Sequence, residues 1–104
     1  MSNYVLAYRG GGVPQTESEQ QAVLAAWGAW FGELGDAVVD GGNPFAASNS
    51  VSSDGSVSSG APSDLTGYSV IKADSLAAAT DLAKGCPILA SGGTVDVYET
   101  VAVM

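Results

Sequence analysis

Apolar positions gather in four short stretches of the chain, and their two-residue spacing or their β-branched and aromatic residues predict β-strands. The clearest stretch is residues 4–9, where Tyr4, Leu6 and Tyr8 fall on one face of the expected strand. Three further strands are predicted at residues 37–40, 67–73 and 94–103. The last of these strands is expected to carry on one face Val95, Val97, Glu99, Val101 and Val103.

Two other stretches have their apolar residues at helical spacing. In residues 16–34, Thr16 and Glu19 match a capping box at the expected start, and Gly35 favours an end. The apolar stripe of this helix comprises Val23, Leu24, Trp27, Trp30, Phe31 and Leu34. A shorter helix should begin after Asp74 or Ser75 and bury Leu76, Ala79, Leu82 and Ala83.

The segment at residues 46–66 is rich in serine, glycine and asparagine and resembles a loop. Within it, residues 51–57 have the form of a hairpin, because Asp54-Gly55 is a favoured pair for a type I′ turn. We therefore expect an irregular ribbon there rather than a disordered segment.

The predicted order is strand, helix, strand, ribbon, strand, helix, strand. This order is that of the split βαβ, or ferredoxin-like, α+β fold, with the βαββαβ elements in one domain over residues 1–104. Two helices on one face of an antiparallel sheet would leave the other face uncovered. Because exposed apolar faces usually mark interfaces, we expect a homodimer in which two sheets face each other.

Charge narrows the range of partners. Eleven acids against three bases give a net charge of -8, and the bases, Arg9, Lys72 and Lys84, are far apart in the sequence. Without a basic cluster, nucleic acids and anionic membrane surfaces are not expected partners. The chain has no histidine and one cysteine, so the sequence predicts no metal site and no cofactor. The single cysteine and the lack of a signal-peptide pattern favour a cytoplasmic location.

Four stretches follow one another in an order typical of a known family. They are residues 26–31 (AWGAWF), 39–45 (VDGGNPF), 67–75 with 83–87 (GYSVIKADS, AKGCP) and 92–99 (GGTVDVYE). Together they resemble the YCII-related, or DGPF-domain, family over nearly the whole chain. The resemblance implies a dimeric α/β barrel and implies little about function. Some members carry a helix histidine proposed as part of an acid–base pair, and this chain, which has no histidine, cannot use that mechanism.

The turn at residues 40–44 is the strongest candidate site. Asp40 could serve as a general base if it were buried, and Asn43 could contact a ligand. The alternative is a turn in which both side chains bind local backbone groups. Trp27, Trp30 and Phe31 could line an apolar pocket in the cleft between helix and sheet, or they could simply belong to the core. Tyr68 could orient a ligand or donate a proton, and Lys72 could bind an anion or be solvated.

Two functions remain open from the sequence. One is a non-catalytic module, homodimeric, that binds a small molecule through Asp40, Asn43, Trp27 and Tyr68. The other is a cofactor-free lyase- or isomerase-like enzyme with Asp40 as the acid/base and a tyrosine as the proton donor. Cys86 is not expected to be a nucleophile, because it follows a helix C-terminus and has no histidine to activate it.

Overall fold

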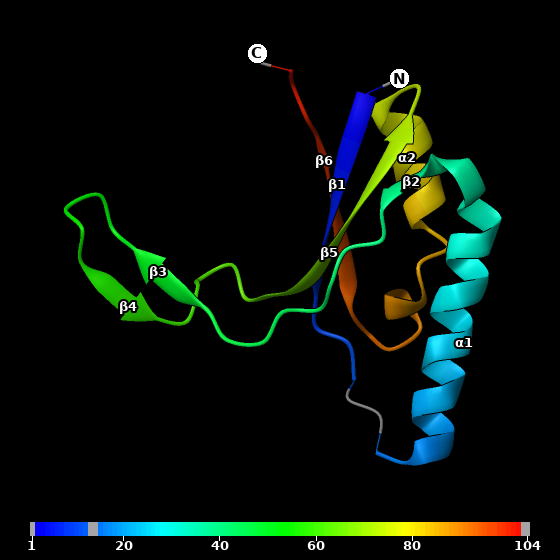
Figure 1. Ribbon diagram of the computed structural model, residues 1–104, viewed down its shortest axis with the longest axis horizontal. Helices are drawn as coiled ribbons and strands as arrows, with labels where there is room; N and C mark the ends of the chain where they lie inside the picture. Colours follow the sequence, from blue (N-terminus) through cyan, green and yellow to red (C-terminus); the bar gives the residue numbers. More distant parts are fainter. Residues whose placement is uncertain (1, 13–14, 103–104) are drawn as a thin grey trace.

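The computed structural model describes residues 2–12 and 15–102, and it is an α+β structure with antiparallel sheets (Figure 1). Its regular elements, in chain order, are β1 (Ser2–Arg9), α1 (Glu17–Leu34), the 3₁₀ turn η1 (Gly35–Ala37), β2 (Val38–Asp40), β3 (Asn49–Val51), β4 (Val57–Ser59), β5 (Leu65–Ala73), α2 (Leu76–Ala83), the 3₁₀ turn η2 (Pro87–Leu89) and β6 (Thr94–Glu99).

The main sheet has four strands in the order β2-β5-β1-β6, and every neighbouring pair is antiparallel. The two central strands are also the longest, with Tyr4 opposite Ile71 and Leu6 opposite Ser69. This order, with one helix after the first strand and one after the third, is compatible with the predicted ferredoxin-like fold.

Both α-helices cover the same face of the main sheet (Figure 1), as the sequence predicted. The covered face forms the core, because alternate residues along β1 and β5 point toward the helices. Its best-buried side chains come from both strands, both helices and the segment after α2, and they are Tyr4, Leu6, Tyr8, Trp30, Ile71, Ala73, Ala79, Ala83, Cys86 and Ile88. The opposite face carries the other parity of residues and is covered by no helix in the part of the chain that the structure describes.

Helix α1 begins and ends where its capping residues predicted. The Glu19 backbone N–H donates to the Thr16 hydroxyl at 3.1 Å, while the Glu19 carboxylate reaches back to the N–H of Gln15 at 2.7 Å. Gly35 ends the helix with a positive φ of 53°. Two residues of the predicted apolar stripe do not belong to the core: Leu24 is 72% exposed, and Val23 does not pack against the core cluster.

The ends of two strands differ from the prediction. Ala37 belongs to η1, so β2 begins at Val38. Strand β6 ends at Glu99, although the N–H of Thr100 still donates to the carbonyl of Asn3 in β1 at 3.1 Å. Val101 is consequently 79% exposed rather than part of the strand. Val103 lies outside the described residues.

Strands β3 and β4 form a separate two-stranded ribbon, as predicted, but its turn is of another type. Only Gly55 has a positive φ, of 89°, whereas a type I′ turn would also require one at Asp54. The Gly55 N–H donates to Ser52 and the Ser52 N–H donates to Ser56, which closes a three-residue loop. Such a loop needs a left-handed residue only at its last position, and glycine supplies it.

Candidate functional site

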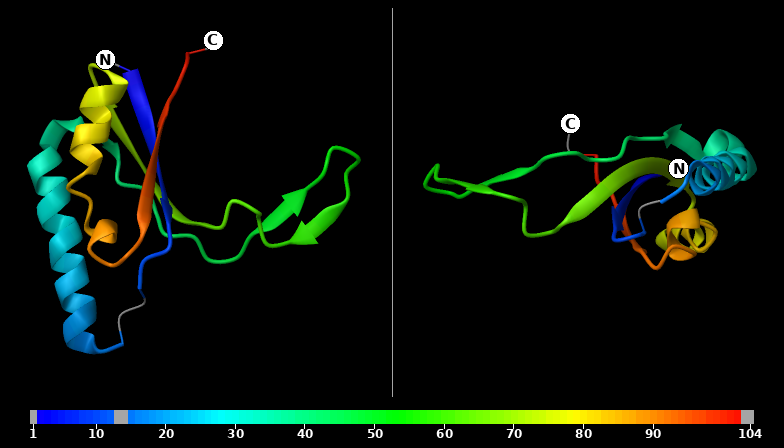
Figure 2. Two further views of the ribbon diagram at one scale, coloured as in Figure 1. Left: turned by 180° about the vertical axis from the view of Figure 1, so that it is seen from behind. Right: turned by 90° about the horizontal axis from the view of Figure 1, so that it is seen from below.

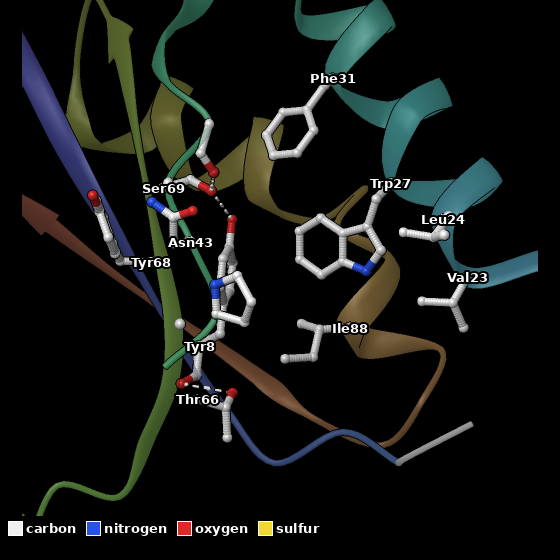
Figure 3. Close-up of a pocket in the computed structure, with 14 residues that line it drawn as sticks. Tyr8, Val23, Leu24, Trp27, Phe31, Asn43, Thr66, Tyr68, Ser69 and Ile88 are labelled. Carbon is white, nitrogen blue, oxygen red and sulfur yellow. Dashed lines mark hydrogen bonds between the residues drawn. The ribbon is translucent and has the colours of Figure 1, made fainter. Parts of the chain in front are cut away.

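A cleft of about 350 Å³ opens between α1 and the edge of the sheet formed by β5 and the segment after β2 (Figure 3). It is lined by Tyr8, Val23, Leu24, Trp27, Phe31, Gly41, Gly42, Asn43, Pro44, Thr66, Gly67, Tyr68, Ser69 and Ile88. No residue in this set of described residues carries a formal charge. The volume falls within the range of small-molecule sites in proteins.

The helix wall of the cleft is built by helical periodicity. Val23, Trp27 and Phe31 are four residues apart and therefore share one face of α1. The Trp27 ring meets the Tyr8 ring edge to face at a centroid distance of 5.2 Å and lies 5.9 Å from the Phe31 ring. These ring contacts fix the orientation of the Trp27 indole, which points into the space between α1 and the sheet (Figure 3).

The opposite wall is the segment at residues 41–45, which lies directly on the β5 backbone. The N–H of Phe45 donates to the carbonyl of Thr66 at 2.9 Å, and the N–H of Tyr68 donates to the carbonyl of Asn43 at 3.3 Å. Gly42 has a φ of 77°, and a Cβ at this position would overlap the carbonyl of Tyr68. Only glycine fits there, so the wall is placed by backbone contact rather than by side-chain packing.

The floor of the cleft carries a buried hydrogen-bond chain. The Tyr8 hydroxyl donates to the Ser69 hydroxyl at 2.7 Å, and the Ser69 hydroxyl donates to the carbonyl of Gly41 at 2.7 Å. Ser69 is 1% exposed, so this pairing removes the cost of burying its hydroxyl. The chain also ties β1, β5 and the segment after β2 together beneath the cavity.

Burial sets the protonation of this floor. It raises the pKa of the Tyr8 phenol far above its ordinary value, although the hydrogen bond with Ser69 opposes the shift. Burial also raises the pKa of the neighbouring Cys86 thiol. Both groups are therefore neutral near pH 7, and a neutral, buried thiol is a poor nucleophile.

The structure separates the predicted site residues into two groups. Trp27 and Asn43 line the cleft. The side chain of Tyr68 points away from the cleft, on the side of β5 opposite to Trp27 (Figure 3). There its ring stacks on the ring of Phe45 at a centroid distance of 5.7 Å. Asp40 is not among the lining residues, and Lys72 is exposed two positions beyond Val70 on the face that carries Tyr68.

Asp40 and Tyr68 do meet, on the uncovered side of the sheet. The Tyr68 hydroxyl lies 3.5 Å from Oδ2 of Asp40, while Oδ1 accepts the N–H of Gly42 at 2.8 Å. The second contact is the local turn bonding that the sequence offered as the alternative to a catalytic role. Asp40 is exposed, so the burial that a general base was expected to need is missing.

Sequence reasoning missed most of the cleft. Trp30, grouped with Trp27 and Phe31 as a pocket residue, is buried in the core instead, where its indole N–H donates to Leu82 at 3.2 Å. Ser69 and Thr66 went unnoticed. A serine in the middle of an otherwise apolar strand is the one signal that could have marked Ser69, since buried hydroxyls need a partner.

A second hollow, of about 380 Å³, lies between α1 and the segment around η2. Alanine and glycine make up much of its lining, and Glu33 adds a carboxylate. It offers a ligand few specific contacts, because such small side chains provide little contact area.

The described residues contain neither a cluster of candidate metal ligands nor a helix that could span a membrane. No three potential ligands among the histidine, cysteine and acidic side chains of residues 2–12 and 15–102 come together. None of the helices in those ranges is long and apolar enough to cross a bilayer. Comparison of the chain with protein families, curated proteins and solved structures finds no match.

Proposed function

We propose that the protein is a homodimeric module that binds a small, uncharged and largely apolar molecule in the cleft between α1 and β5. The observation that carries this proposal is the composition of the lining, which combines aromatic faces with neutral polar groups and contains no charged side chain. An anionic ligand would bring its charge into an apolar cavity of an acidic protein without a basic partner, which is costly.

The neutral groups at the cleft would orient the ligand. Asn43 offers an amide from the facing segment, and the Thr66 hydroxyl, which donates to the carbonyl of Tyr8 at 3.2 Å, can still accept from a ligand. The Tyr8 and Ser69 hydroxyls already have partners, so a ligand needs to satisfy few buried polar atoms. A molecule of one or two rings matches the volume of about 350 Å³ and can lie against Trp27 and Phe31.

The test compares neutral and charged probes of the same shape. Indole-3-acetamide and indole-3-acetate differ only in having an amide or a carboxylate, and ligand-observed NMR should detect binding of indole and of the amide while the acid binds at least tenfold more weakly than the amide. Val23→Trp should fill the cleft and abolish indole binding. Ala25→Trp, on the exposed part of the same helix, is the matched control and should leave it unchanged. Equal binding of the amide and the acid, or indole binding that survives Val23→Trp, would contradict the proposal.

The homodimer is proposed on the uncovered sheet face. That face carries Val39, which is 50% exposed, and Tyr98, which is 57% exposed, together with Val70 of β5. Two such faces packed together would make the dimeric α/β barrel that the resemblance to the YCII-related family implies. Membership of that family and a cytoplasmic location stay predictions from the sequence.

The second candidate function is a cofactor-free lyase- or isomerase-like enzyme. The 3.5 Å approach of the Tyr68 hydroxyl to Asp40 favours it, because an acid and a base at that distance could exchange a proton with a substrate. In a dimer this pair would lie near the subunit interface rather than in the cleft. Asp40→Asn should then abolish deuterium exchange into a carbonyl substrate in D₂O, and exchange at the wild-type rate in that variant would exclude Asp40 as the base.

A further inference from the structure

The β3–β4 ribbon is the part of the described structure with the least support from its own chain. Its strands pair only with each other, so both outer edges are free. Val51 and Val57 face each other across the ribbon, yet they are 68% and 64% exposed. Because an isolated two-stranded hairpin is marginally stable in water, such a ribbon normally packs against something else.

The direction of the ribbon shows where that support would come from. The helices lie on one side of the main sheet and the ribbon projects on the other, in both Figure 1 and Figure 2. At the base of the ribbon, Phe45 is 46% exposed and stacks on Tyr68, which belongs to the uncovered sheet face. The apolar surface therefore continues from the sheet face toward the ribbon.

We infer that the ribbon is an arm that packs its Val51–Val57 face against a second copy of the chain seated on the uncovered sheet face. This inference rests on the proposed homodimer and adds to it the segment that holds the two copies together.

Charge favours a second copy as the occupant. Each copy has a net charge of -8, so association requires contact surfaces with little net charge of their own. On the sheet face the charges offset one another, because Arg9 pairs with Asp96 at 3.2 Å and Lys72 is opposite in sign to Asp40. Residues 46–63 contain one charged residue, Asp54, which lies in the turn at the tip. A cationic partner would be expected to meet an acidic surface instead of this neutral one.

The area of the sheet face also favours an interface between two copies to which the ribbon contributes. The strands β2, β5, β1 and β6 have 3, 9, 8 and 6 residues. At roughly 3.3 Å per residue and about 4.8 Å between strands, the sheet face has a footprint of only about 400 Å². A stable interface usually buries about 800 Å² on each partner. The sheet face alone falls short of this area, and an arm that embraces the partner supplies the difference.

The decisive experiment measures self-association by sedimentation velocity over a range of concentrations. The double variant Val51→Asp/Val57→Asp places two charges on the proposed contact face and should weaken dimerisation at least tenfold. The double variant Ser50→Asp/Ser58→Asp adds the same charges at the neighbouring register pair, on the opposite face of the ribbon, and should change it less than threefold. Equal effects of the two variants, or no effect of the first, would overturn the inference.

A third variant separates this inference from the homodimer itself. Val70→Asp charges the sheet face and should dissociate the dimer completely. If Val70→Asp dissociates it and the valine double variant does not, the dimer stands and the arm is wrong. A wild-type protein that is monomeric at every concentration overturns both the homodimer and the arm. This holds even if the ribbon then binds another protein. Isotope-filtered NMR on mixed-label dimers should show contacts from the Val57 methyls to the other copy.

Discussion

The two sides of the main sheet are made by the same strands, yet the described chain covers only one of them. On the helix side, Leu6 and Ile71 are completely buried. On the other side, Val39 is 50% and Tyr98 57% exposed. Strand alternation therefore creates one apolar face, which the two helices cover, and a second face on which exposed apolar residues such as Val39 and Tyr98 stand beside the charged Asp40 and Lys72. The difference indicates that one face provides the stability of the single chain and the other is available for association.

The largest expected effect comes from neighbouring residues on β5 that point to opposite sides. Ile71→Ala should reduce the free energy of unfolding by about 3 kcal/mol, because it leaves a cavity in the core. Val70→Ala should cost less than about 1 kcal/mol in the monomer, since Val70 is only half-buried. Urea denaturation at low protein concentration measures both. Similar losses for the two variants would show that the two faces do not differ as described.

The second-largest effect is expected in the segment at residues 41–45, which follows β2 and forms one wall of the cleft. Gly42→Ala should cost roughly 2 kcal/mol, because the residue has a positive φ and its new Cβ would meet the Tyr68 carbonyl. Gly41→Ala is the control, since a Cβ there meets nothing within 4 Å. The Gly42 variant should also lose indole binding, because the wall of the cleft must move. A stable Gly42→Ala variant with an intact cleft would contradict the structure of this segment.

The parts of the fold that the sequence predicts are those set by local chemistry. The Thr16 hydroxyl and Gly35 define α1 through backbone groups within four residues. The end of β6 could not be predicted in this way. Val101 continues the alternation of the strand, but whether it is paired depends on a partner in β1, nearly a hundred residues away in sequence.

The candidate site was harder to predict because alternation does not say which face the helices cover. Tyr68 and Val70 share one parity of β5, and Ser69 and Ile71 share the other. Both parities include an apolar β-branched residue, so the sequence allowed Tyr68 to face Trp27. The helix–sheet cleft itself was foreseen from Trp27 and Phe31, since their helical spacing directs them toward the sheet.

A smaller effect is expected at the buried hydroxyl chain on the helix side. Tyr8→Phe should cost about 1 kcal/mol by removing the hydrogen bond to Ser69. Folding raises the pKa of Tyr8, so the stability that its neutral phenol provides is complete below the ordinary value of 10.0 and is lost as the pH rises toward the higher folded value. Wild-type stability should therefore fall more steeply above pH 10 than that of Tyr8→Phe.

Thermal denaturation between pH 7 and 11 measures this difference. Cys86 contributes with the same sign from its ordinary value of 9.0, and it does so in both proteins. Tyr98→Phe removes an exposed phenol and serves as the control, with a pH profile like that of the wild type. Parallel profiles for Tyr8→Phe and the wild type would show that the Tyr8 phenol is not buried in the neutral form.

The smallest expected effect on global stability lies in the ribbon. Gly55→Ala forces an alanine into a φ of 89° and should reduce the stability of the ribbon by about 1 kcal/mol. Because the ribbon pairs only with itself, this loss should not reach the core, and the urea midpoint of the monomer should stay unchanged. NMR shifts of Val51 and Val57 should nevertheless move toward random-coil values. A lowered monomer midpoint would mean that the ribbon already helps to hold the sheet, and the uncovered face would then receive support from its own chain.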